Sequence, residues 1–142
     1  MKKLKILIID NDPIINIGFK SIFKNSSIFE ITSFTNSKDE ITDIICQYEI
    51  DLVISEINFK NGTIKDILKL FKKNNIDVPL LVFTSETNEK KSINLLKLGV
   101  SGFMTKNLKK KSIRQIIEDI AFSKYGSKEL NKYTRLKNRF NF

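Results

Sequence analysis

Four apolar stretches of this sequence each end in side chains that could do chemistry. The residues are Asp10, Asn11 and Asp12 after "LKILII", Ser55 and Glu56 after "DLVI", Thr84 and Ser85 after "VPLLVF", and Thr105 and Lys106 after "SGFM". Clustered carboxylates favour a hard cation such as Mg²⁺, which takes oxygen ligands. A lysine and a hydroxyl beside the acids would suit a phosphoryl group, by charge and by hydrogen bonding. The residue types therefore indicate a site for a divalent cation and a phosphoryl group.

These side chains meet only if the apolar stretches are strands of one sheet. The run at residues 4–10 is apolar throughout, which is typical of a parallel strand buried on both faces. Further strands are predicted at residues 29–34, 51–55, 78–84 and 101–105, and helices at residues 13–25, 37–47, 64–74, 88–99 and 110–126. Five β–α units with right-handed crossovers predict an α/β fold with a doubly wound, five-stranded parallel sheet. In such sheets, ligands bind at the carboxyl ends of the strands.

Short patterns mark where the predicted helices begin and end. Asp12 before Pro13 is a helix start, and so is the Ser-x-x-Glu pattern at residues 37–40. Gly99 is typical of a helix end. Cys46 lies in an apolar helical stretch and is predicted to be in the core.

Composition excludes several kinds of active site. The sequence has no histidine, which excludes Ser-His and Cys-His catalysis, histidine zinc sites and a phosphohistidine relay within this chain. Neither a P-loop pattern nor a G-x-G-x-x-G follows the first predicted strand, so a nucleotide site is not expected there. The single cysteine allows no internal disulfide, which agrees with a cytoplasmic protein. No apolar run reaches ~18 residues, so no membrane span is expected.

Positive charge is concentrated near the C-terminal end. Residues 106–142 contain eleven Lys or Arg and three Asp or Glu, a net charge of +8, whereas residues 1–105 contain fourteen and thirteen, a net charge of +1. Residues 125–142 are predicted to form a basic tail, mostly one additional helix. Clustered lysine and arginine attract nucleic-acid phosphates, but so short a segment cannot form a complete helix-turn-helix with its own core.

The residues at the strand ends resemble, in type and order, the CheY-like receiver domain of bacterial two-component response regulators. The resemblance covers about residues 3–123, and it implies a receiver domain at residues 1–124 and a flavodoxin/CheY-like strand order of 2-1-3-4-5. It implies these roles: Asp10 and Asn11 in place of an acidic pair, Glu56 in place of the aspartate that accepts phosphate from a histidine kinase, Asn58 as a carbonyl ligand of Mg²⁺, Thr84 and Lys106 as phosphoryl contacts, and Phe103 as an aromatic switch residue. The P-x-x-x-x-G spacing of "PIINIG" is similar to that of receivers that precede a C-terminal helix-turn-helix.

Asn11 is the first departure from the family's pattern. It replaces an acid that usually binds the metal, so a Mg²⁺ site formed by Asp10, Glu56 and Asn58 should be weakened. Asp12 could restore the lost charge only in part, because it is predicted to cap a helix.

Glu56 is the second departure. Its carboxylate stands one methylene, roughly 1.5 Å, further from the backbone than that of an aspartate. A misplacement of ~1 Å can cost ~100-fold in an in-line reaction, so phosphorylation at Glu56 should be poor or absent. The longer acid could hold Lys106 and Thr84 in an activated-like arrangement, or it could form a plain ion pair with Lys106.

The sequence therefore predicts a receiver that has no enzymatic activity of its own and signals through protein contacts, independently of phosphate. The expected partner is a histidine kinase, another regulator or a second copy of the chain. One alternative is a DNA-binding transcriptional regulator that uses the basic tail. Another is a haloacid-dehalogenase-type phosphatase with Asp10 as nucleophile and Asp12 as acid/base, whose second acidic pair would be Glu118 and Asp119 inside a predicted helix.

Overall fold

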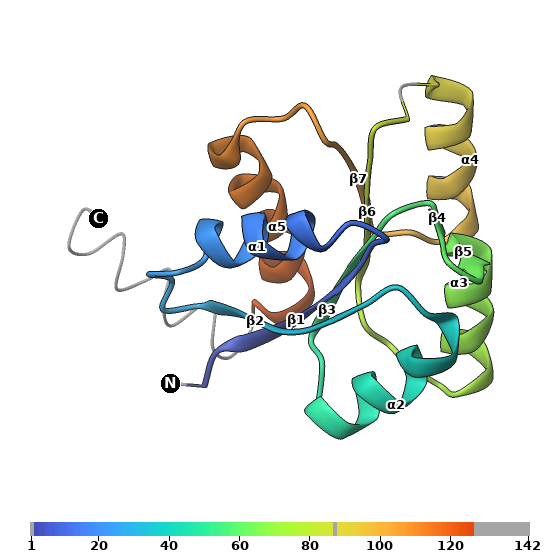
Figure 1. The fold of residues 1–142 in the computed structure, drawn as a ribbon, viewed down its shortest axis with the longest axis horizontal. Coiled ribbons are helices and arrows are strands. Elements are labelled where there is room, and N and C mark those ends of the chain that lie inside the picture. The colour runs from blue at the N-terminus through green and yellow to red at the C-terminus, as the bar shows by residue number, and fades with distance from the viewer. Residues whose placement is uncertain (1, 87, 127–142) are drawn as a thin grey trace.

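A computed structural model describes residues 2–86 and 88–126, in which helices separate the strands of the main sheet along the chain (Figure 1). The helices are α1 (Pro13–Ile22), α2 (Lys38–Tyr48), α3 (Ile64–Lys73), α4 (Glu89–Leu98) and α5 (Lys110–Tyr125). The strands are β1 (Leu4–Ile9), β2 (Phe29–Thr35), β3 (Leu52–Ser55), β4 (Asn58–Phe59), β5 (Gly62–Thr63), β6 (Leu80–Thr84) and β7 (Gly102–Thr105). Among these residues, no helix is long and apolar enough to cross a membrane.

The main sheet has five strands in the order β2-β1-β3-β6-β7, and each neighbouring pair is parallel. Since β6 and β7 are the fourth and fifth strands of this sheet along the chain, the predicted order 2-1-3-4-5 and the doubly wound α/β fold are confirmed. Parallel pairing brings the carboxyl ends of all these strands to one edge of the sheet, which is called the rim below.

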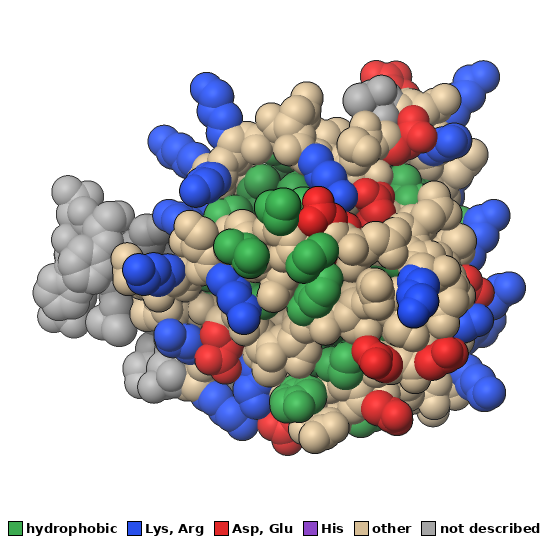
Figure 2. Space-filling model, viewed as in Figure 1, with side chains coloured by type: hydrophobic (Ala, Val, Ile, Leu, Met, Phe, Trp, Pro, Cys, Tyr) green, Lys and Arg blue, Asp and Glu red, His purple; other side chains and the backbone are tan. Residues whose placement is uncertain are grey.

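The helices bury an apolar face and expose a charged one. In α3 the buried residues Ile64, Ile67 and Phe71 recur at intervals of three and four, so they lie on one side of the helix. Figure 2 shows lysine, arginine, aspartate and glutamate side chains spread over the visible surface. Two apolar residues of α1 are exceptions to this pattern, since Ile14 and Ile17 are 68% and 64% exposed.

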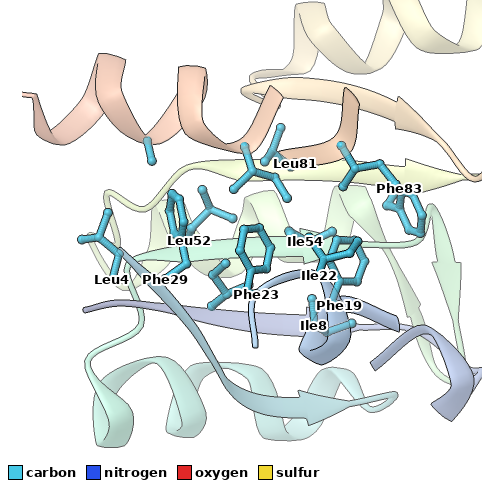
Figure 3. Close-up of a cluster of buried hydrophobic side chains, with 14 of the residues drawn as sticks. Leu4, Ile8, Phe19, Ile22, Phe23, Phe29, Leu52, Ile54, Leu81 and Phe83 are labelled. Atoms are coloured by element: carbon cyan, nitrogen blue, oxygen red, sulfur yellow. The ribbon is translucent and has the colours of Figure 1, made fainter. Parts of the chain in front are cut away.

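One apolar cluster lies on each face of the sheet. The first is covered by α1 and α5, which supply Phe19, Ile22, Ile113, Ile117 and Ala121, and by Phe23 directly after α1. Figure 3 shows part of this cluster against the strands. The second is covered by α2, α3 and α4, which supply Ile41, Ile45, Ile64, Ile67, Phe71 and Leu95. Because both faces are covered, the residues from Ile6 to Ile9 of β1 are at most 1% exposed. This burial explains the uninterrupted apolar run in the sequence.

Two of the predicted helix signals are confirmed. Asp12 caps α1, since its Oδ1 accepts a hydrogen bond from the backbone N–H of Ile14 at 3.0 Å. Gly99 ends α4 with φ of 114°, a left-handed conformation that glycine adopts without strain.

The predicted capping box at residues 37–40 is wrong. The side chain of Ser37 makes no capping bond, and the Glu40 carboxylate accepts instead from the Thr35 hydroxyl at 2.5 Å. The first amide of α2 is satisfied by another segment, because the backbone N–H of Lys38 donates to Asn61 Oδ1 at 2.6 Å. Asn61 lies in the turn of a short antiparallel hairpin formed by β4 and β5, which was not predicted.

The predicted burial of Cys46 is also wrong. Cys46 is exposed, although it adjoins the buried Ile45. Successive residues of a helix point about 100° apart, so the residue after an inward-facing isoleucine turns away from the sheet.

The predicted tail, residues 125–142, lies mostly outside the described residues, and its division from a receiver domain at 1–124 stays a prediction. Its first residue, Tyr125, belongs to α5. The Tyr125 hydroxyl donates to the backbone carbonyl of Asp51 at 2.6 Å, so the last turn of α5 is tied to the start of β3.

Tyr125→Phe should lower the free energy of unfolding by about 1 kcal/mol at pH 7, the typical net value of one hydrogen bond. Burial, followed by the charges of Asp51 and Asp77, raises the pKa of Tyr125 to about 12. The un-ionised hydroxyl therefore stabilises the fold below its unfolded pKa of about 10, and this contribution is lost as the pH rises toward 12. Urea unfolding between pH 7 and pH 12 should show the deficit of the variant shrinking above about pH 10. The exposed Tyr48→Phe is the control, and a deficit that is constant with pH would contradict the account.

Candidate functional site

The rim brings together the chemically active residues predicted from the sequence. Asp10 follows β1 and is 3% exposed, Glu56 follows β3, and Lys106 follows β7. Backbone hydrogen bonds extend the sheet beyond the strands and fix two of these residues. Glu56 N–H donates to the carbonyl of Ile9 at 2.9 Å, and Lys106 N–H donates to the carbonyl of Thr84 at 2.8 Å.

Lys106 pairs with two carboxylates at once. Its Nζ lies 3.0 Å from Asp10 Oδ2 and 2.9 Å from Glu56 Oε2. The side chains of Lys106, Glu56 and Asp10 are only 24%, 16% and 4% exposed, so these ion pairs are partly shielded from water. The group of Asp10, Glu56 and Lys106 is called the rim triad below.

Opposing effects act on the pKa of Lys106. Burial alone would lower this pKa, because it penalises the charged ammonium. The hydrogen bonds to Glu56 and Asp10, and the charges of the same two carboxylates, outweigh burial and raise the pKa above its ordinary value. The ammonium therefore stays charged at neutral pH. Its Nζ also lies 5.9 Å from the ring centroid of Phe83, within cation–π range.

The second oxygen of Glu56 turns back to the chain. Glu56 Oε1 accepts from the backbone N–H of Ile57 at 2.7 Å, while Oε2 faces Lys106. The hydroxyl of Thr84 accepts from the N–H of Glu86 at 3.2 Å, and among the described residues it makes no hydrogen bond to Glu56. Glu56 therefore forms an ion pair with Lys106, and within the described residues the Thr84 hydroxyl is not hydrogen-bonded to either side chain of this pair.

Asn11 and Asn58 lie together on the exposed side of the rim. Asn11 Nδ2 is 3.5 Å from the backbone carbonyl oxygen of Asn58, at the long limit of a hydrogen bond. Asn11, Glu56 and Asn58 line an open hollow of about 500 Å³, together with Ile57, Thr84, Ser85, Glu86 and Lys91.

The donors at the rim fit a divalent cation poorly. In the described part of the chain, no three Asp, Glu or Cys side chains gather closely enough to hold a metal ion. Asp10 Oδ1 accepts from the N–H of Asp12 at 2.9 Å, and Asp10 Oδ2 faces Lys106. Asp12 itself caps α1. The oxygens that would bind Mg²⁺ are therefore engaged by donors of the chain.

Phe103, the predicted switch residue, lies on β7 and is partly buried against the second apolar cluster. Other contacts at the rim were not predicted. The Ile57 amide that donates to Glu56 is a backbone group, so no residue type in the sequence indicates this contact. Phe83 could have been noticed, since it immediately precedes Thr84 on a predicted strand.

Comparisons with known proteins agree with the fold. A family model described as the response regulator receiver domain matches residues 6–118. The nitrate/nitrite response regulator protein homolog of Haemophilus influenzae is 26% identical over 119 residues, which cover 84% of this chain and 57% of that protein. The transcriptional regulatory protein DegU of Brevibacillus brevis is 24% identical over 123 residues, which cover 84% of this chain and 50% of that protein. This chain therefore spans about half the length of these two relatives.

A similar fold is found in a solved structure. The signal receiver domain of a LuxO repressor protein from Vibrio parahaemolyticus superposes with a TM-score of 0.76 at 14% identity, and the match covers 99% of each chain.

Glu56→Gln should lower the free energy of unfolding by about 1–2 kcal/mol at pH 7, because it removes one of the two charges that compensate a partly buried ammonium. Glu49→Gln is the matched control. Glu49 pairs with Lys2 at 3.4 Å, but both side chains are 72% exposed, so its loss should cost less than about 0.5 kcal/mol. Urea unfolding measures the free energy of unfolding of both variants. Equal losses would contradict the prediction that the partly buried ion pairs of the rim triad contribute more than an exposed pair.

Proposed function

Because the chain belongs to the response regulator receiver domain family, we propose that it acts in two-component signalling as a receiver that works through protein contacts without accepting a phosphoryl group at its rim. A receiver controls other proteins through its surface, so no enzymatic activity of its own is needed.

The position of the Glu56 carboxylate carries this proposal. The resemblance puts this residue in place of the family's phosphoacceptor, but both of its oxygens are bound, one by the Ile57 amide and one by Lys106. An oxygen that attacks phosphorus must be held in line with the leaving group. A glutamate bent back onto its own backbone and paired with an ammonium does not offer such an oxygen.

An apolar patch beside the rim supports contact with a protein. Ile14 and Ile17 of α1 are 68% and 64% exposed, and Ile14 directly follows Pro13 at the start of the helix. Figure 2 shows apolar side chains gathered over the region where Figure 1 places α1. Contiguous exposed apolar side chains are typical of surfaces that bind another protein.

A DNA-binding regulator is the second candidate. A relative that covers 84% of this chain is named a transcriptional regulatory protein, and residues 106–142 carry a net charge of +8 (eleven basic and three acidic residues). A gel shift with duplex DNA that weakens with salt, and that is lost when the chain is cut after Gly126, would support this candidate.

The phosphatase alternative has no such support. Asp12, its predicted acid/base, accepts a hydrogen bond from Ile14 N–H at the start of α1. The family match is to a receiver domain.

Incubation with acetyl phosphate and Mg²⁺, followed by intact mass spectrometry, tests the phosphate-independence. The wild-type chain should show no prompt gain of one phosphoryl group. The double variant Asn11→Asp, Glu56→Asp should show that gain, because it restores a shorter carboxylate and a second metal-binding acid at the rim. The gain should be labile to hydroxylamine, as expected for an acyl phosphate. A hydroxylamine-labile gain in the wild type that disappears in Glu56→Gln would overturn the proposal.

A further inference from the structure

The divalent cation implied by a receiver rim does not fit the donors of this chain, and the positive charge at the rim comes from the chain itself. Lys106 Nζ lies 3.0 Å from Asp10 and 2.9 Å from Glu56, between the two carboxylates. We propose that Lys106 is the permanent counter-ion of this rim and that, together with Asn11, it takes the place of a divalent cation. The rim then keeps its shape without metal.

Each carboxylate oxygen of the rim triad has a donor. Asp10 Oδ1 accepts from Asp12 N–H at 2.9 Å, and Glu56 Oε1 accepts from Ile57 N–H at 2.7 Å. The remaining two oxygens face the ammonium. Mg²⁺ demands near-octahedral oxygen ligands at short distances. It would have to displace the ammonium or lie beside it, and two cations so close in a partly buried site repel each other strongly.

Asn11 takes over the second role of a divalent cation, which is to connect two segments of the rim. A metal at this rim would join the end of β1 to the segment after β3 by binding both. Here the Asn11 amide faces the Asn58 carbonyl directly, at 3.5 Å, and links the same two segments. The other side of the β4–β5 hairpin is held by Asn61, which accepts from Lys38 N–H at 2.6 Å. The hairpin is thus held on both sides by amide groups, neither of which needs a cation.

The burial of Asp10 separates this arrangement from an ordinary surface ion pair. Its side chain is 4% exposed, whereas both partners of the Lys2–Glu49 pair are 72% exposed. A carboxylate so far from water requires a compensating charge, and Lys106 provides it.

Thermal unfolding of the full chain with EDTA, or with about 10 mM MgCl₂, against NaCl of equal ionic strength tests the proposal. The Tm of the wild type should change by less than about 1 °C. Lys106→Met should lower the Tm by about 5–10 °C in EDTA, because two carboxylates lose their counter-ion. MgCl₂ should then return about 4 °C to this variant, as expected when a weak metal site is created. Lys106→Arg keeps the positive charge, so its Tm should not change with MgCl₂.

Lys91→Met is the matched control, because Lys91 lines the same hollow and pairs with Glu86 at 3.2 Å. It should show no response to Mg²⁺. The proposal is overturned if the wild-type Tm rises with MgCl₂ by about 4 °C or more, or if folded Lys106→Met gains nothing from the metal.

Should Lys106→Met not fold, electron paramagnetic resonance of Mn²⁺ with the wild type decides the question. An undiminished signal of free Mn²⁺ supports the proposal, and loss of about one free ion per chain refutes it. These readouts are independent of the phosphoryl transfer tested above. A wild type that binds Mn²⁺ but gains no phosphoryl group would refute the counter-ion role and leave the proposed function standing.

Discussion

One ammonium shared by two carboxylates is the interaction on which the rim depends. Asp10, Glu56 and Lys106 come from the ends of β1, β3 and β7, so the rim triad joins three of the five strands of the main sheet. The fold makes this possible because the five strands of the main sheet are parallel and both faces of this sheet are covered. The three charged side chains of the rim triad therefore lie at the edge of the sheet, where partial burial strengthens their attraction.

Asn11 and Glu56, the two departures that the resemblance predicts, are consistent with each other in charge. An acid at position 11 would add a third carboxylate beside Asp10 and Glu56, and the single ammonium of Lys106 could not balance it. An asparagine removes that charge and contributes an amide that faces Asn58. The extra methylene of Glu56 lets its carboxylate reach Lys106 and the Ile57 amide at the same time. At the rim, donors of the chain itself engage the carboxylates of Asp10 and Glu56.

The sequence was sufficient to predict the sheet and the residues that meet at its rim. Continuous apolar runs mark strands buried on both faces, and strand ends that share one edge must bring their side chains together. The direction of the Glu56 carboxylate could not be predicted from the sequence, because it depends on hydrogen bonding to the backbone amide of Ile57 and on pairing with Lys106. The cap that Asn61 provides for α2 comes from a different segment of the chain. Cys46 is exposed although its stretch of sequence is apolar, because only one face of the helix meets the core.

The most direct test of the rim triad is the pKa of Lys106 itself, measured by NMR from the pH dependence of its ¹³Cε shift. Burial alone would place this pKa below the ordinary value of a lysine, whereas pairing with Glu56 and Asp10 raises it above that value. The account predicts a titration midpoint above the ordinary lysine value in the wild type, and a lower midpoint in Glu56→Gln. A wild-type midpoint at or below the ordinary value, unchanged in Glu56→Gln, would contradict it.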